Sequence, residues 1–480
     1  MSYKVPPTLL SLAMQNLLRD QASSMSALND LPMELFPALF MDVFMGRHTK
    51  ILKAMMAAWP FPCLPVGALM KTPHMQTLQA LLRGLDMLIA QKVRLRRCKL
   101  LVLDLRTSHN NFWDVWTGRE DGSCSTQGVR RKQRAMDFPK SSLRQRMKVL
   151  VDIAIRFHLD KYQTYFLQWA QQRKNYLQLC CIKMQIQSLP IYTIRNVFKV
   201  FQLESTEELE LSADWNLSTL AQFAVNLGQL RNLHKLSLAL IYKSTPKGEN
   251  TYTVMEKRVT KFIYHFSKLV HLQHLYMNEV YFLNGHTNKL FGCLKTPLQT
   301  LCVTHCHLSL ADLNHLAQSQ ILSQLKHLDL SATDLFHLSP RPLQVLLERV
   351  ASTLQTLELK DCRMEDTQLH DLLPALSQCA QLTQVNFLDN SFSMASLKDL
   401  FHHTASLSQL SLELYPAPQE CYDDAGNVLL ERLDQLCHEL VATLRDIRQP
   451  KTVYFASAVC LNCFERCVFE LVTKPCVCWQ

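Results

Sequence analysis

The sequence predicts an α/β solenoid in which short parallel strands alternate with outer helices along the chain. From about residue 200 onward the pattern L-x-x-L-x-L recurs seven times, in steps of 25 to 29 residues with one exception of 39. Between the copies, apolar residues such as Leu343, Leu346, Leu347 and Val350 follow helical spacing. Steps of this length are typical of leucine-rich repeats, which stack into a horseshoe.

Each copy of the pattern has the physical properties of one stacking unit. Its last two apolar residues alternate, so they share one face of a strand, and a single unit cannot bury that face alone. Cys or Asn often follows the strand, as at Cys306, Cys362 and Asn390, and we expect these buried groups to meet free backbone groups at the turn.

The residues between the strand leucines are predicted to form an exposed concave face. Their chemistry is mixed, which favours a protein ligand over a partner with one dense charge. The alternative is that binding uses the convex side or the insertions. The residues expected on this face are Ser237, Tyr276, Cys302, Asp329, Glu358, Asn386 and Ser411.

The predicted organisation has three parts. Residues 1–95 are rich in helical patterns and are expected to form an N-terminal helical cap. Residues 96–445 hold the repeats, which are degenerate over 96–211 and regular over 230–415, with loop insertions near 107–140 and 243–258. Residues 446–480 form a Cys-rich C-terminal tail.

Composition excludes several classes of protein. Hydrophobic residues make up 48% of the 480 residues, yet no stretch reaches the roughly 18 uninterrupted apolar residues of a membrane helix. The N-terminus lacks the features of a secretory signal, so the 17 cysteines are expected to remain thiols in the cytoplasm, the nucleus or both. Glycine, at 11 residues, is too scarce for phosphate-binding loops.

The net charge of +10 is concentrated between Arg94 and Lys148. We interpret this excess as a solvated basic face or loop, with nuclear import or an anionic partner as the alternative. Aromatic residues are not interleaved with the basic runs, so direct nucleic-acid binding is not expected.

Two short patterns lie in the predicted cap. Leu9, Ala13 and Leu17 follow one another at i, i+4 and i+8 and therefore form one stripe of a helix that begins after Pro6 and Pro7. With Thr8, this stripe matches the elongin-binding box, in which a leucine enters an apolar pocket and a small residue allows close helix approach.

The second pattern matches the proline-containing box that engages cullin-2. Its residues are Phe36, Pro37, Phe40 and Val43. The overlapping segment LPMELF, residues 31–36, also matches the start of an F-box, which binds the SKP adaptor. Both alternatives lead to a ubiquitin ligase.

The tail contains four thiols in two pairs. Cys460, Cys463, Cys476 and Cys478 could surround one tetrahedral zinc ion. The alternative is a reduced tail without metal. No cofactor other than this zinc ion is expected.

Several segments together resemble the PRAME (preferentially expressed antigen in melanoma) family. They are PPTLLSLA, LPMELFPALF, LKAMMAAWPFPCLPVGALM and VLDLR-x6-FWDVWTG, and the repeats follow them. The resemblance covers nearly the whole chain. It implies a leucine-rich horseshoe of germline and tumour cells that acts as substrate receptor of cullin-2 ligases through elongin. It also implies repression of retinoic acid receptor signalling, reduced apoptosis and differentiation, and raised proliferation.

One feature departs from the family pattern. The family tail has a similar cysteine spacing but usually has Pro and Gly around the first pair, where this chain has Leu461 and Phe464.

Because the resemblance implies repression of the retinoic acid receptor, we searched the sequence for L-x-x-L-L boxes that could dock to a nuclear receptor. The chain has three, at 78–82, 343–347 and 369–373. Helical periodicity favours burial of their leucines over docking to a nuclear receptor.

The sequence predicts no active site of the chain's own. Cys302, His305, Cys306 and His307 lie on or beside a predicted strand, where turn and surface roles are commoner than catalysis. The predicted function is therefore a substrate adaptor of a cullin-2-type ubiquitin ligase, with elongin B/C, cullin-2, a protein substrate and nuclear receptors as expected partners. The alternative is a transcriptional corepressor or scaffold without ligase activity.

Overall fold

The computed structural model describes residues 9–70, 74–91, 97–107, 112–113, 146–242, 251–460 and 465–469. The chain divides into two compact units, Met1–Met184 with Tyr192–Thr206 and Gln185–Ile191 with Glu207–Gln480. Both units contain helices and strands, the strands are ordered in the sheet as they are in the sequence, and neighbouring strands such as β1 and β2 or β6 and β7 are parallel. The predicted α/β leucine-rich-repeat architecture is therefore confirmed.

The first unit begins with helices and continues with strand-helix repeats. Its helices are α1 (Leu9–Arg19), α2 (Gln21–Ala27), α3 (Phe36–Met45), α4 (Thr49–Ala57), α5 (Met75–Ala90), α8 (Lys161–Arg173) and α9 (Ile191–Phe198). Its strands are β1 (Cys63–Pro65), β2 (Val102–Asp104), β3 (Met147–Ile155) and most of β4 (Leu177–Gln187), whose last three residues belong to the second unit. Since β1 pairs with β2, the sheet begins inside the segment that was expected to be a helical cap.

Aromatic side chains form the core between the first helices and β1. The fully buried Trp59 lies 5.2 Å from Phe40 and 6.2 Å from Phe36, measured between ring centroids. The indole nitrogens of Trp59 and Trp113 donate to the backbone oxygens of Cys63 and Pro65, at 3.0 and 2.7 Å. These bonds attach the segments that resemble the PRAME family to the first strand.

The second unit contains the regular repeats. Its strands are β5 (Glu208–Asn216), β6 (Lys235–Tyr242), β7 (His274–Val280), β8 (Thr300–Thr304), β9 (His327–Asp329), β10 (Thr356–Glu358), β11 (Gln384–Asn386), β12 (Leu412–Pro416) and β13 (Val453–Ala456). Its helices are α10 (Leu217–Leu227), α11 (Thr251–Phe266), α12 (Thr287–Gly292), α13 (Leu310–Gln318), α14 (Arg341–Val350), α15 (Asp366–Leu376), α16 (Met394–His403) and α17 (Leu430–Ile447).

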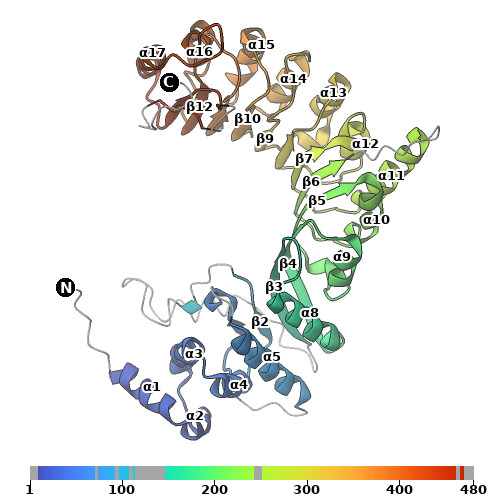
Figure 1. Ribbon diagram of the computed structural model, residues 1–480, viewed down its shortest axis with the longest axis vertical. Helices are drawn as coiled ribbons and strands as arrows, with labels where there is room; N and C mark the ends of the chain where they lie inside the picture. Colours follow the sequence, from blue (N-terminus) through green and yellow to red (C-terminus); the bar gives the residue numbers. More distant parts are fainter. Residues whose placement is uncertain are drawn as a thin grey trace. The chain divides into compact units, whose positions relative to one another are not determined.

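Within this unit the strands form one layer and the helices form the other (Figure 1). The leucines of successive copies pair in register, as Leu236 with Leu275, Leu275 with Leu301, and Leu301 with Leu328. All four side chains are at most 1% exposed. Burial of such stacked leucines is the main favourable contribution to the stability of the layer.

At or just after the end of each strand from β6 to β11, a residue other than glycine has a left-handed backbone conformation. The six equivalent residues of β6 to β11 have φ between 51° and 60° and are Leu240, Glu279, His305, Ala332, Asp361 and Asp389. Directly after this position, the Asn390 side chain donates to Leu359 O at 2.7 Å and accepts from Cys362 N at 3.1 Å. The Cys306 sulfur accepts from Val280 N at 3.3 Å. The predicted role of these groups at the turn is confirmed.

Two boundaries differ from the prediction. Residues 251–258 of the expected loop insertion are helical, because α11 begins at Thr251. The expected tail contains one more repeat strand, β13, which pairs with β12. The repeats therefore extend into the segment predicted as tail.

Among the residues that the structure describes, no helix is long and apolar enough to cross a membrane.

Candidate functional site

Six of the seven residues predicted on the concave face form one line across six strands. The register pairs Ser237 with Tyr276, Tyr276 with Cys302, and Cys302 with Asp329. It continues from Asp329 to Glu358 and from Glu358 to Asn386. Because their neighbours in the strand point into the core, these side chains lie on the opposite, outer face of the strand layer.

Ser411 does not belong to this line, and its prediction was wrong. The partner of Asn386 is Leu414, while Ser411 lies before β12 and its hydroxyl donates to Thr383 O at 2.9 Å. The cause is that Glu413 occupies the inward position that a leucine or valine takes in the preceding repeats. The strand register is therefore displaced from the one that the leucine spacing suggests.

The centre of the line is acidic and partly desolvated. The Glu358 carboxylate accepts from Gln384 Nε2 at 2.6 Å. Burial, and after it the negative charge of Asp329, raises the pKa of Glu358. Burial, together with the charges of Asp329 and Glu358, raises the pKa of Cys302 to about 12. The Cys302 thiol is therefore protonated at pH 7 and is a poor nucleophile.

A second line of polar residues runs beside the first and was missed by the sequence reasoning. It joins Lys235, His274, Thr300, His327 and Thr356 across five strands. His274 Nδ1 lies 2.9 Å from Thr300 Oγ1, and His327 Nδ1 lies 3.0 Å from Thr356 Oγ1. Burial lowers the pKa of both imidazoles. The signal was present, since these residues precede the first strand leucine of each copy.

The residues of the predicted elongin-binding box lie on α1. The Leu9 side chain is 87% exposed, Ala13 is exposed and Leu17 is half-buried. Thr8 lies outside the described residues. The helix thus presents apolar surface to solvent at its start.

The residues of the predicted cullin-binding box lie in the core. Phe36, Phe40 and Val43 have no exposed surface, and Pro37 is buried as well. Phe40 also stacks on Trp113, with ring centroids 5.6 Å apart. Helix α3 can therefore offer a partner only its other side, where Asp42 and Met45 are exposed.

The overlapping F-box pattern and the L-x-x-L-L boxes also have defined places. Pro32, Met33 and Glu34 are exposed at the turn before α3. The box leucines are buried, with exposed fractions of 5% or less, which confirms the expected role in core packing. They are Leu78, Leu81, Leu82, Leu343, Leu346, Leu347, Leu369, Leu372 and Leu373.

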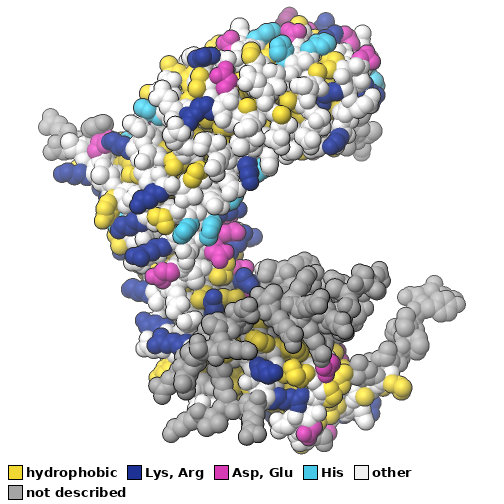
Figure 2. All heavy atoms as spheres, turned by 180° about the vertical axis from the view of Figure 1, so that it is seen from behind, with side chains coloured by type: hydrophobic (Ala, Val, Ile, Leu, Met, Phe, Trp, Pro, Cys, Tyr) yellow, Lys and Arg dark blue, Asp and Glu magenta, His cyan; other side chains and the backbone are white. Residues whose placement is uncertain are grey.

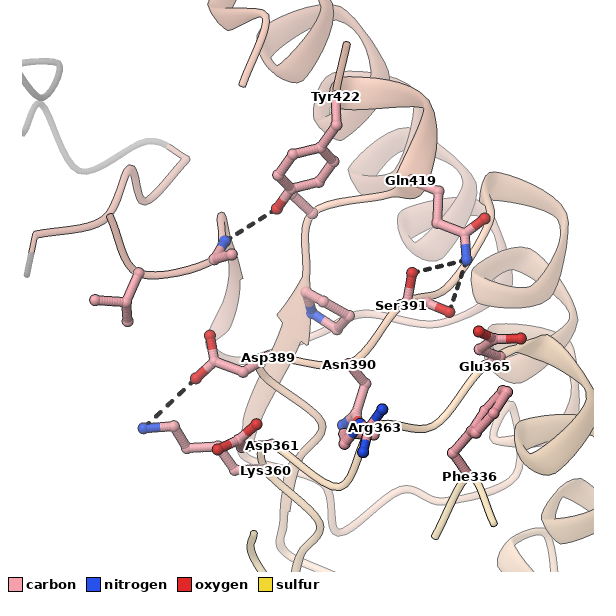
Figure 3. Close-up of a pocket in the computed structure, with 14 residues that line it drawn as sticks. Phe336, Lys360, Asp361, Arg363, Glu365, Asp389, Asn390, Ser391, Gln419 and Tyr422 are labelled. Carbon is pink, nitrogen blue, oxygen red and sulfur yellow. Dashed lines mark hydrogen bonds and ion pairs between the residues drawn. The ribbon is translucent and has the colours of Figure 1, made fainter. Parts of the chain in front are cut away.

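A cavity of about 730 Å³ lies at the turns that follow β10, β11 and β12 (Figure 3). Asp389 lies at its edge and binds two cations, Lys360 Nζ at 3.6 Å and Arg466 at 3.0 Å. Gln419 Nε2 donates to both oxygens of Ser391 at 2.9 Å, and the Tyr422 hydroxyl accepts from Ala458 N at 2.9 Å. Most of these polar groups satisfy one another, so the cavity is best explained as part of the structure of the turns.

Figure 2 shows charge on the part of the second unit that carries α14 to α17. Basic, acidic and histidine side chains are interspersed there, which is typical of a solvated surface.

The predicted zinc ligands are described only in part. Cys460 is 5% exposed, whereas Cys463, Cys476 and Cys478 lie outside the described residues. In the part of the chain that is described, no three His, Cys, Asp or Glu side chains come together as a metal site would require. Burial also raises the pKa of Cys306 to about 11, which makes this thiol a poor nucleophile beside His305 and His307.

The stacked strands, the outer helices and the two polar lines on the outer face of the strands define a leucine-rich-repeat protein with a face suited to binding other proteins. Comparison with known proteins gives the family. Residues 6–113 match the PRAME N-terminal domain and residues 147–478 match the PRAME C-terminal domain. The chain belongs to the PRAME family.

Relatives within the family match along the whole chain. PRAME family member 12 from Homo sapiens is 45% identical over 99% of this chain and 98% of its own length. PRAME family member 8 from Homo sapiens is 43% identical over the full length of both chains. The family and the repeat fold together suggest a binding protein without catalysis of its own.

Among solved structures, a chain of the yeast Rad7 and Elc1 complex is similar. It has 12% sequence identity and a TM-score of 0.42, and the match covers 86% of this chain and 94% of that one.

Proposed function

We propose that the protein is a non-catalytic substrate-recognition adaptor of a cullin-2-type RING ubiquitin ligase. Helix α1 binds elongin B/C, the outer face of the strands binds a protein substrate, and the recruited ligase marks that substrate for proteasomal degradation. The single observation that carries the proposal is the 87% exposure of Leu9 on a helix placed ahead of the repeats.

The exposure of Leu9 has an energetic consequence. A fully buried leucine side chain is more favourable than an exposed one by about 1.5–3 kcal/mol. An apolar pocket on a partner therefore gains from accepting Leu9, and the small Ala13 lets the partner approach α1 closely. This is the mode of recognition that the elongin-binding box implies.

The cullin contact has to use a different set of atoms from those first expected. Phe36, Phe40 and Val43 hold the core around Trp59, so we assign the contact to the exposed side of α3, including Met45, which is 60% exposed. Pro37 contributes by starting α3, since proline is well accommodated in the first turn of a helix.

A pull-down with purified elongin B/C and cullin-2 tests the proposal. We expect Leu9→Asp to reduce elongin capture by at least about tenfold, since it removes the apolar contact and places a charge in the pocket. Leu430→Asp is the matched control, because Leu430 is an exposed leucine on α17 far from α1 in sequence. Equal capture by wild type and Leu9→Asp would refute the assignment.

The substitution Met45→Asp extends the same test to cullin-2, because Met45 lies on the exposed side of α3. We expect Leu9→Asp to lose elongin, and Met45→Asp to keep elongin but lose the cullin-2 contact. This result would show that the two contacts use different residues. The alternative function, a corepressor or scaffold without a ligase, predicts that nuclear partners are retained and that neither ligase subunit is captured by the wild-type chain.

A further inference from the structure

Three aromatic rings that are exposed or half-buried lie side by side on consecutive repeats of the second unit. Tyr242 and Tyr281 each directly follow one member of the register pair Ile241 and Val280. Their ring centroids are 5.7 Å apart, with an interplanar angle of 20°. The His307 ring follows Tyr281 at 5.7 Å and 32°. The repeat thus places three rings in one row, which we call the aromatic row.

The row remains accessible to a ligand. Tyr242 is 40% exposed, His307 is exposed and Tyr281 is half-buried. Neighbouring rings at a centroid separation of 5.7 Å are not directly superposed. Large aromatic side chains that remain exposed in adjacent positions are characteristic of binding surfaces.

Two carboxylates accompany the row. Asp214 is exposed in β5 and Glu279 is half-buried in β7. Each directly precedes a register partner of Ile241, the neighbour of Tyr242, because Ile241 pairs with Trp215 on one side and with Val280 on the other. Local desolvation, and after it the negative charges of Asp214 and Glu279, raises the pKa of the Tyr242 phenol. Among the described residues, neither carboxylate forms an ion pair. In the described part of the chain, the surface therefore combines accessible aromatic rings with carboxylates that have no ion-pair partner.

This combination matches a guanidinium group. Arginine is planar, stacks on aromatic faces and presents five N–H donors that fit carboxylates, whereas the ammonium of lysine is a compact and strongly hydrated charge. A phosphate backbone fits poorly, since Asp214 and Glu279 would repel it. We propose that Tyr242, Tyr281 and His307, flanked by Asp214 and Glu279, form a binding site for an arginine-containing segment of a partner protein.

The proposal rests on the proposed function only for the identity of the partner, which would be the recruited substrate. None of the residues involved belongs to the predicted concave line. The row lies at the ends of three strands that carry the line, since Tyr242 is the last residue of β6, Tyr281 directly follows β7 and His307 follows β8.

Fluorescence anisotropy of the full chain with a labelled peptide of alternating glycine and arginine tests the site. We expect saturable binding, and a weaker signal for the same peptide with lysine in place of arginine. Tyr281→Ala is expected to weaken binding by about three- to tenfold, the loss associated with one cation–π contact. Tyr176→Ala, at a tyrosine that is 64% exposed in the first unit, is the matched control and is expected to bind like wild type.

The double variant Asp214→Asn with Glu279→Gln separates stacking from charge. We expect it to weaken binding and to remove most of its dependence on salt. Unchanged binding by both the Tyr281 and the carboxylate variants would overturn the proposal. Preferential binding of a thymidine oligonucleotide over the arginine peptide would overturn it as well and would indicate a stacking surface for nucleic acid.

Elongin capture by the same variants distinguishes this site from the proposed function. Retained elongin capture with lost peptide binding supports both proposals. Peptide binding by a wild-type chain that captures no elongin refutes the ligase assignment alone. A circular dichroism melt of each variant verifies that the repeats remain folded.

Discussion

Glu413 and Arg448 form a bidentate ion pair inside the second unit. The guanidinium donates to both carboxylate oxygens, with Nη1 to Oε1 at 2.6 Å, and the Tyr415 hydroxyl donates to the same carboxylate at 2.7 Å. The Glu413 side chain has no exposed surface and that of Arg448 is 10% exposed. The pair connects the inward side of β12 to the end of α17, at a position where earlier repeats use an aliphatic residue.

Removal of one partner from this pair should be costly. We expect Glu413→Ala or Arg448→Ala to lower the free energy of unfolding by about 3–5 kcal/mol, since either change leaves a buried charge without its counterion. Urea unfolding followed by circular dichroism measures the loss. The double variant Glu413→Leu with Arg448→Met should recover much of it, and a double variant that is no more stable than the single ones would contradict this explanation.

Asp312 should make the second unit sensitive to acid. Its side chain is 1% exposed and accepts from Gly285 N at 2.9 Å and from the Thr287 hydroxyl at 2.7 Å. Burial alone would raise the pKa of Asp312, but hydrogen bonds from Ser309, Gly285 and Thr287 outweigh it, and the net pKa lies below 3.8.

A carboxyl group whose pKa is lower in the folded than in the unfolded chain stabilises the fold at any pH above its unfolded-state pKa. This contribution is lost as the pH falls through its folded-state pKa. We therefore expect wild type to exceed Asp312→Asn in stability at pH 7, and the difference to shrink below about pH 4. Thermal melts of both proteins from pH 7 to pH 3 measure it. A difference that stays constant over this range would contradict the assigned role.

Ala332 should gain stability on replacement by glycine. Its φ of 58° lies in the left-handed region, which costs an alanine about 1 kcal/mol but costs glycine nothing. We expect Ala332→Gly to raise the free energy of unfolding by up to about 1 kcal/mol, and Ala332→Val to lower it, because a β-branched side chain is worse in this region. Urea unfolding of the pair provides the measurement, and the opposite order would show that the turn is not strained.

We also expect the tail to hold one zinc ion through Cys460, Cys463, Cys476 and Cys478. Elemental analysis of the purified full chain should find about one equivalent of zinc, and Cys463→Ser with Cys476→Ser should release it. Cys293→Ser, at a half-buried thiol of the second unit, is the control and should leave the zinc content unchanged. Equal zinc content in the wild type, the double variant and the control would show that these tail cysteines are reduced thiols without metal.

Regular parts of the fold could be predicted because their spacing reports directly on burial. Leu236, Leu275 and Leu301 occupy the inward positions that the pattern predicts. Strand β3 was missed although Val149, Val151 and Ile153 alternate with more exposed residues, since it lacks the leucine signature. The leucine pattern could not predict the displaced register of β12. That register buries Glu413, which is acceptable only because Arg448, 35 positions later, reaches its carboxylate.

The candidate site was predictable to a similar degree. Tyr276, Asp329 and Glu358 lie on the expected line, since side-chain alternation determines the face. Burial of Phe36 and Phe40 could not be read from a short motif, because a helix stripe packs equally well on its own core or on a partner. The row of Tyr242, Tyr281 and His307 depends on register between repeats, and only the three-dimensional structure reveals it.

The most direct test asks whether helix α1 and the outer face of the strands bind different partners. Affinity purification with mass spectrometry would compare the wild-type chain, Leu9→Asp, and Asp329→Lys with Glu358→Lys. We predict that the strand variant keeps elongin and cullin-2 but loses the substrate proteins, and that Leu9→Asp keeps the substrates and loses the ligase. Identical substrate sets for wild type and the strand variant would contradict the claim that the outer face of the strands binds the partner.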